Sequence, residues 1–153
     1  MIAEGKKAPD FTLESSAGGS LSLKELRGKT VVLYFYPKDD TPGCTREACA
    51  FRDSQAALKK KGAVVLGVSG DSLPSHEKFK AKYKLNFPLL SDPDKAVAKK
   101  YGAWGEKVLY GKKTVGMIRS TFVIDGEGVV RKVFPRVRVD GHADQVLAAL
   151  GEL

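Results

Sequence analysis

Two mostly apolar runs stand out in the chain, and turn residues flank both of them. Residues 31–36 and 63–69 contain few polar side chains, which is typical of strands buried on both faces of a sheet. Residues 11–13 and 21–23 instead alternate apolar and polar positions around a turn rich in serine and glycine. This alternation predicts a short N-terminal β-hairpin.

Helical spacing of apolar residues separates and follows these runs. It extends over four segments: 43–61, 72–85, 95–101 and 142–150. Residues 120–124 and 129–134 flank Asp125-Gly-Glu-Gly, which is a hairpin signal. Residues 104–116 follow no regular pattern, so their shape is not predicted. The order of elements predicts one α/β domain over residues 1–153, with a central mixed β-sheet flanked by helices.

The composition limits the classes of protein that this chain can belong to. It has 153 residues and a net charge of +8, and basic proteins often bind nucleic acid. Its lysines are dispersed along the chain, however, and no zinc-finger or RNA-binding motif accompanies them. We therefore expect solvated helix faces and no nucleic-acid partner. No apolar segment suits a signal peptide or a membrane span, so we expect a soluble, cytoplasmic protein without a membrane partner.

Both cysteines lie within one stretch, residues 37–49, which joins the first central strand to the first long helix. On a helical wheel Cys44 shares a stripe with Ala48 and Phe51, whereas Cys49 is rotated by about 140°. A thiol in a first helical turn faces free backbone N–H groups and the positive end of the helix dipole, which favour the thiolate. This position suits a nucleophile. The alternative is a small buried side chain without chemistry.

The same residues make a metal site improbable. Two cysteines are too few for a disulfide scaffold, and structural zinc requires about four ligands. His76 and His142 are the remaining strong ligands, and they lie in distant segments. We expect both histidines at the surface, and we expect no metal or organic cofactor.

The sequence around Cys44 resembles that of a known family. Pro37, Thr41 and Cys44 match the pattern Pro-x-x-x-Thr/Ser-x-x-Cys of the peroxiredoxins, and the order of elements resembles the thioredoxin fold. The string Thr-Pro-Gly-Cys-Thr-x-Glu-Ala-Cys is similar to the bacterioferritin-comigratory-protein (peroxiredoxin Q) subgroup. The later strings Tyr-Gly-Ala-Trp-Gly-Glu-Lys and Gly-Met-Ile-Arg-Ser-Thr-Phe are similar to it too.

This resemblance implies a thiol peroxidase that reduces hydrogen peroxide and organic hydroperoxides. Cys44 would attack the peroxide, Thr41 would bond the thiolate and the peroxide, and Pro37 would shield the pocket. Arg119 would place its guanidinium beside the thiolate. Cys49 would resolve the sulfenic acid as an intramolecular Cys44–Cys49 disulfide, which thioredoxin or a similar dithiol protein would reduce. We expect a monomer.

Each assignment has a simpler alternative. Arg119 could be a surface arginine, Thr41 an N-cap and Pro37 a strand terminator. Glu47 could be a favourable first-turn charge or part of a polar network, and we expect Trp104 to serve in packing. Two rival functions also remain. One is a thiol–disulfide oxidoreductase on the same fold, although those usually carry Cys-x-x-Cys. The other is a basic nucleic-acid-binding protein.

The spacing of the cysteines has a consequence of its own. Residues five apart on a helix have Cα atoms roughly 8.6 Å apart, whereas a disulfide requires at most about 6.8 Å. The two cysteines therefore cannot bond while both lie in regular helix, and we expect the first turns to unwind on oxidation. Gly43, the charged pair Arg46 and Glu47, and the off-core side of Cys49 are expected to make this opening inexpensive.

Overall fold

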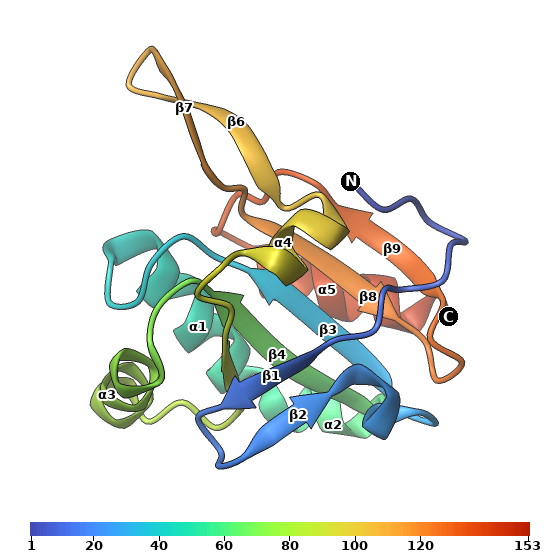
Figure 1. The fold of residues 1–153 in the computed structure, drawn as a ribbon. Helices are drawn as coiled ribbons and strands as arrows, with labels where there is room; N and C mark the ends of the chain where they lie inside the picture. Colours follow the sequence, from blue (N-terminus) through green and yellow to red (C-terminus); the bar gives the residue numbers. More distant parts are fainter.

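A seven-stranded mixed sheet forms the centre of the molecule (Figure 1). The computed structural model describes residues 1–153, apart from the side chain of Leu109. The strands of the sheet are β1 Thr12–Ser15, β2 Ser20–Ser22, β3 Thr30–Phe35, β4 Ala63–Ser69, β5 Leu89–Ser91, β8 Ser120–Ile124 and β9 Val130–Phe134. Their spatial order is β2-β1-β5-β4-β3-β8-β9. The two apolar runs, β3 and β4, lie near its middle, as their burial requires.

The pairing confirms the mixed sheet. β3, β4 and β5 run parallel, whereas β8 and β9 pair antiparallel on one side and β1 and β2 on the other. The predicted N-terminal hairpin is therefore present as β1 and β2, and the predicted hairpin around Asp125 as β8 and β9. The parallel strands end at the edge of the sheet where the cysteine loop begins, the usual place for a functional site in such sheets.

Helices cover both faces of the sheet. They are the 3₁₀ turn η1 Leu23–Leu26 and the α-helices α1 Pro42–Asp53, α2 Gln55–Lys60, α3 Leu73–Tyr83, α4 Ala96–Tyr101 and α5 His142–Gly151. Side chains of β3 alternate between two cores: Val32 and Tyr34 pack with α1, α2, α3 and α5, and Leu33 and Phe35 pack with α4. The alternation follows from the two-residue period of a strand.

The long helix predicted over residues 43–61 is divided in two, so that prediction was wrong in its continuity. α1 ends at Asp53, Ser54 has φ −96° and ψ 4°, and α2 begins at Gln55. The carbonyl oxygen of Phe51 accepts both from the side-chain amide of Gln55 at 3.3 Å and from the backbone N–H of Ser54 at 3.2 Å. Both helices still present an apolar stripe to the same core, through Phe51 and Leu58. This shared stripe explains why the sequence pattern ran through the break.

Residues 104–116, for which no shape was predicted, form a second, two-stranded sheet. β6 Trp104–Leu109 and β7 Lys112–Met117 pair antiparallel and extend away from the body of the molecule (Figure 1). Val108 and Val115 are exposed in this hairpin, so the alternation that marks a half-buried strand is absent. Trp104 packs against the α4 core, as expected of it.

The remaining helix ends follow their sequence signals. The Ser72 hydroxyl accepts a hydrogen bond from the backbone N–H of Ser75 at 3.3 Å and caps α3, and Gly102, at φ 76°, ends α4. Within the described chain, no helix combines the length and apolar character that crossing a membrane demands.

Candidate active site

Cys44 lies in the first turn of α1, directly beyond the loop that follows β3. Pro42 occupies the start of the helix, a position that tolerates a missing N–H. The backbone N–H of Thr45 donates to the carbonyl oxygen of Thr41 at 2.8 Å and closes the first turn. The Cys44 side chain faces the core with 2% exposure. The predicted core-facing stripe is therefore confirmed, and the thiol lies at the positive end of the helix.

Arg119 approaches Cys44 from the segment between β7 and β8. Its Nη2 lies 3.2 Å from Cys44 Sγ, and its Nη1 lies 2.7 Å from Glu47 Oε1. The guanidinium is largely buried, so the surface alternative for Arg119 is wrong. Burial works against its charge, but Glu47 and then Cys44 outweigh burial and raise the pKa of Arg119. A permanent cation with two directed N–H groups is thus fixed beside the sulfur.

Glu47 is the buried counterion of Arg119, which decides its role in favour of the polar network. The residue is 1% exposed. Burial raises the pKa of Glu47 to about 7, although Arg119 opposes this shift. Glu47 Oε2 and the nearby Tyr34 hydroxyl are both buried without a hydrogen-bond partner in the described chain. The Glu47 carboxyl therefore orients Arg119 through Oε1, whereas Oε2 accepts no hydrogen bond from the described chain.

Thr41 and Pro37 lie in the loop between β3 and α1. The Thr41 hydroxyl donates to the carbonyl oxygen of Lys38 at 2.9 Å, and its side chain makes no cap bond in α1. It forms no hydrogen bond with Cys44 within the described chain, so its contact with thiolate or peroxide stays a prediction. Pro37 is exposed, and its shielding role stays a prediction as well.

A cavity of about 450 Å³ opens beside Arg119. Pro37 and Lys107 border it, together with apolar side chains that include Met117 and Ile118. Lys107 is held by a hydrogen bond from its Nζ to the carbonyl oxygen of Met117 at 2.9 Å. Burial, and after it the charge of Arg119, lower the pKa of Lys107, whereas Cys44 acts in the opposite direction. The cavity gives a small molecule access to Arg119, whereas Cys44 itself does not line it.

Comparison with known proteins identifies the family. The model of the AhpC/TSA family matches residues 4–133. A Coxiella burnetii relative with a bcp-type peroxiredoxin name is 55% identical over 149 residues, which cover 97% of this chain and 99% of the relative. The peroxiredoxin Bcp of Bacillus subtilis is 45% identical, with coverage of 99% and 97%. This chain belongs to the AhpC/TSA family of peroxiredoxins.

Solved structures place the peroxiredoxin in the same group. A bacterioferritin comigratory protein from Xanthomonas campestris, solved in work on its alkyl peroxide reduction, superposes with a TM-score of 0.88. It is 44% identical, and the match covers 93% of this chain and 90% of that one. The fold prediction, a thioredoxin-like α/β domain, is confirmed by these neighbours.

Cys49 shares α1 with Cys44 in this peroxiredoxin, and both thiols are free. The helix is regular from Pro42 to Asp53, as predicted for the reduced state. One part of the expectation was wrong: Glu47 is not a solvated charge that eases opening, because it is buried against Arg119. Unwinding the first turns therefore separates a buried ion pair.

Both histidines of the peroxiredoxin are buried, so their predicted surface location was wrong. His76 is 0% and His142 1% exposed. His142 Nε2 lies 2.8 Å from the Thr121 hydroxyl, two residues from Arg119, and its ring packs edge-on against Phe51. The sequence did contain a signal. His76 is three residues before buried Phe79, and His142 four before buried Val146, which places each on the apolar stripe of its helix.

One cluster in the described chain has the residue types of a metal site. Ligand atoms of Asp39, Asp71 and His76 lie within 4.8 Å of one another. These atoms are already engaged with protein donors and acceptors, which include Tyr36 and Ser69. The cluster is therefore built as a hydrogen-bond network, and the absence of a cofactor stays a prediction.

Proposed function

We propose that this peroxiredoxin is a thiol-dependent peroxidase in which Cys44 reduces hydrogen peroxide and organic hydroperoxides. The observation that carries the proposal is the 3.2 Å contact between Arg119 Nη2 and Cys44 Sγ at the start of α1. A thiolate is the nucleophile that O–O cleavage requires, and a fixed guanidinium stabilises both that thiolate and charge on the departing oxygen.

The first chemical step consumes one peroxide. The Cys44 thiolate attacks one oxygen of the peroxide, an S–O bond forms, and the O–O bond breaks. Sulfur is oxidised to a sulfenic acid, and the departing oxygen takes up a proton and leaves as water or an alcohol. Arg119 is the group that stabilises the negative charge on that oxygen. Glu47 holds Arg119 at 2.7 Å, so the guanidinium need not reorient during the step.

The second step regenerates the enzyme through Cys49. The Cys49 thiol displaces water from the Cys44 sulfenic acid and forms an intramolecular disulfide. A dithiol protein of the thioredoxin kind then reduces this disulfide. Five residues of regular helix keep the cysteines too far apart for a bond, so we expect residues 42–50 to unwind first. In this proposal the enzyme is a monomer, and it acts in the cytoplasm.

The nearest alternative is a thiol–disulfide oxidoreductase on the same fold. The burial of Cys44 speaks against it, because a protein disulfide has to reach the attacking sulfur. A nucleic-acid-binding protein is the other alternative. It predicts affinity that falls steeply with salt concentration, and a salt-titrated binding assay separates it from a peroxidase.

The test is thiol-dependent peroxide reduction by the wild type, Cys44→Ser and Cys49→Ser. We expect Cys44→Ser to be inactive and folded, and Cys49→Ser to reduce one peroxide per chain and then stall as the sulfenic acid. Mass spectrometry of the oxidised wild type is expected to show a Cys44–Cys49 disulfide, with faster amide exchange over residues 45–51. Substantial turnover by Cys44→Ser contradicts the proposal, and equal exchange in both redox forms contradicts the unwinding.

A further inference from the structure

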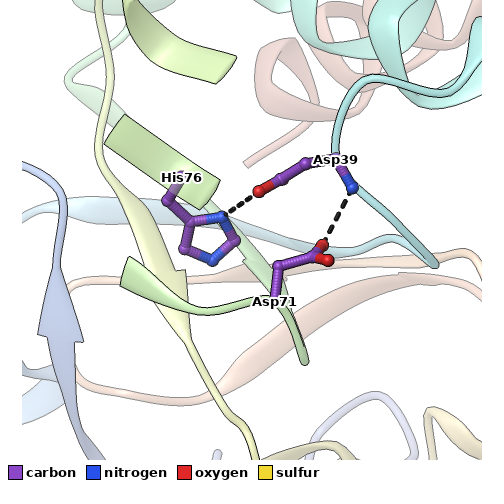
Figure 2. Close-up of side chains that lie close together, drawn as sticks. All are labelled: Asp39, Asp71 and His76. Atoms are coloured by element: carbon purple, nitrogen blue, oxygen red, sulfur yellow. Dashed lines mark hydrogen bonds and ion pairs between the residues drawn. The ribbon is translucent and has the colours of Figure 1, made fainter. Parts of the chain in front are cut away.

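The loop that carries the chain from β3 into α1 is anchored by the buried side chain of Asp39, in addition to the exposed bonds of Asp40 to Lys82 and Tyr83. Asp39 is 7% exposed. Figure 2 shows Asp39 pointing from its loop towards His76 of α3, with its backbone N–H directed at Asp71 beyond β4. The loop therefore meets residues 71–76, more than 30 positions further along the chain, at a residue five positions before Cys44.

The carboxylate of Asp39 is fully used. Its Oδ1 accepts from the Tyr36 hydroxyl at 2.6 Å, and its Oδ2 accepts from the Ser75 hydroxyl at 2.8 Å. His76 Nδ1 lies 2.7 Å from the same Oδ2, and the Asp39 N–H donates to Asp71 Oδ2 at 2.8 Å. Hydrogen bonds to charged groups contribute more than neutral ones, and removing one partner of a buried group costs the most.

His76 is itself oriented from its far side. Its Nε2 lies 2.9 Å from the carbonyl oxygen of Leu90 in β5, and a carbonyl can only accept, so Nε2 carries a proton. The imidazole therefore joins the Asp39 loop to the central sheet through two directed bonds, one from each nitrogen.

A second attachment lies at the other end of the segment that contains the cysteines. Phe51 is 0% exposed, and its ring packs against Tyr34 with centroids 4.9 Å apart and against His142 at 5.9 Å. Between Asp39 and Phe51 lie Cys44 and Cys49, the only cysteines of the chain. The chain between the two attachments is the part of α1 that has to unwind, and fixed ends restrict the conformations that the unwound chain can adopt.

We propose that Asp39, oriented by His76, is a positioning residue that sets the balance between peroxide attack by Cys44 and its resolution by Cys49. The network holds the start of α1 in the attacking arrangement and opposes its unwinding. Loosening it therefore slows attack and, in the same protein, speeds disulfide formation. This inference rests on the proposed function, since resolution by Cys49 is part of it.

Two substitutions of His76 separate its two bonds. The amide nitrogen of asparagine reaches the place of Nδ1, and that of glutamine the place of Nε2. His76→Asn therefore keeps the bond to Asp39, whereas His76→Gln keeps only the bond to Leu90. Asp39→Asn weakens the network directly. Glu77→Gln is the matched control, because Glu77 is the exposed neighbour of His76 on α3.

Stopped-flow measurement of thiol oxidation gives the rate of peroxide attack by Cys44. Timed quenching followed by mass spectrometry gives the rate at which Cys49 forms the disulfide. We expect Asp39→Asn and His76→Gln to lower the attack rate and to raise the resolution rate, each by about tenfold, the scale of one lost buried hydrogen bond to a charged group. His76→Asn is expected to stay within about threefold of the wild type in both rates, and Glu77→Gln to match it. Sulfinic acid formation is expected to fall in the first two variants.

If Asp39 and His76 only stabilise the fold, the two rates are expected to change differently. In that case both rates fall together with the folded fraction, and this result, or unchanged rates in Asp39→Asn and His76→Gln, overturns the inference. If the wild type forms no Cys44–Cys49 disulfide, the resolution step of the proposed function has failed instead. The attack rate and amide exchange of residues 40–47 in a Cys49→Ser background then still decide the role of Asp39. If Asp39→Asn does not fold, the two His76 variants provide the comparison.

Discussion

Two buried polar clusters flank the loop before α1, and they differ in how completely their hydrogen bonds are satisfied. In the cluster of Asp39, Asp71 and His76, each ligand atom is engaged with the surrounding protein. In the cluster of Cys44, Glu47 and Arg119, one oxygen of Glu47 has no partner in the described chain. Arg119 also borders an open cavity. Unused bonding capacity is costly in a core, so its presence here is consistent with the proposal that this cluster meets the peroxide.

The clusters also differ in charge. Glu47 and Arg119 form an ion pair beside a thiol, and burial raises the pKa of Glu47 to about 7. Asp39 Oδ2 and His76 Nδ1 lie 2.7 Å apart within a network that Tyr36, Ser69 and Ser75 complete. The first cluster therefore places a cation and a carboxyl beside the thiol, whereas the second joins the loop before α1 to α3 and the sheet. Substitutions in the first cluster are expected to affect the chemistry at Cys44 directly, whereas those in the second act through the position and stability of the loop before α1.

The largest effect is expected at Arg119. Arg119→Ala removes the cation beside Cys44, so the thiolate fraction and the stabilisation of the departing oxygen both fall. We expect the rate constant for peroxide attack to fall by about 10²-fold or more, as for loss of one donor from an oxyanion site. Arg119→Lys is expected to recover only part of it, because lysine lacks the planar pair of donors.

Stopped-flow kinetics and a pH titration of the thiolate absorbance measure this effect. Arg131→Ala, an exposed arginine of β9 paired with Asp125, is the control. An unchanged rate and titration in Arg119→Ala would show that the contact with Cys44 has no role in the chemistry.

A smaller, pH-dependent effect is expected at Glu47. The folded protein binds the Glu47 proton more tightly than the unfolded chain, since the pKa rises from 4.5 to about 7. This residue therefore stabilises the fold at low pH, and that contribution is lost as the pH rises from about 4.5 to about 7. Glu47→Gln is expected to remove this contribution, which is on the order of 3 kcal/mol.

Urea denaturation of both proteins across this pH range measures the difference. The difference in unfolding free energy is expected to vary with pH between the two values and to stay constant above them. A constant difference over the whole range contradicts the raised pKa. The attack rate of Glu47→Gln is expected to fall less than that of Arg119→Ala, since the amide oxygen can still accept from Arg119.

The smallest effect distinguishes two tyrosines of the same strand region. The Tyr36 hydroxyl donates to Asp39 at 2.6 Å, whereas the Tyr34 hydroxyl has no partner in the described chain. Tyr36→Phe is expected to lower the unfolding free energy by about 1–3 kcal/mol, the cost of leaving a buried acceptor short of a bond. Tyr34→Phe is expected to leave it unchanged or to raise it slightly. Equal losses in the two variants would contradict the contrast between the clusters.

Sequence patterns predicted the parts of the fold that local periodicity determines. β3, β4 and the two hairpins followed from runs and alternation, and α3 began at its Ser72 cap. The division at Ser54 was missed because the apolar stripe continues across it. The β6–β7 hairpin was missed because its exposed strands lack alternation. The spacing of apolar residues along the chain shows neither where a helix is interrupted nor where a strand has no buried face.

The residues of the candidate site also differ in how far the sequence predicted them. Cys44 and its orientation followed from the helical wheel, and Arg119 from the family resemblance. The partnership of Glu47 with Arg119 depends on a contact between residues 72 positions apart, which no local pattern specifies. The same holds for Asp39 and His76, 37 positions apart. For the histidines the stripe positions were available, but the expectation that histidine prefers the surface outweighed them.

The break at Ser54 affects how quickly the enzyme can return to its attacking form. α1 has 12 residues, a length at which an isolated helix is only marginally stable in water. Unwinding that begins at Pro42 can stop at Phe51, and α2 then keeps its contacts with β4. If the disulfide forms and is reduced as proposed, the chain that stays in place from Phe51 onwards provides the end from which the helix re-forms, at about nanoseconds per residue. In that case the chemistry of reduction, rather than helix formation, limits recovery of the reactive thiol.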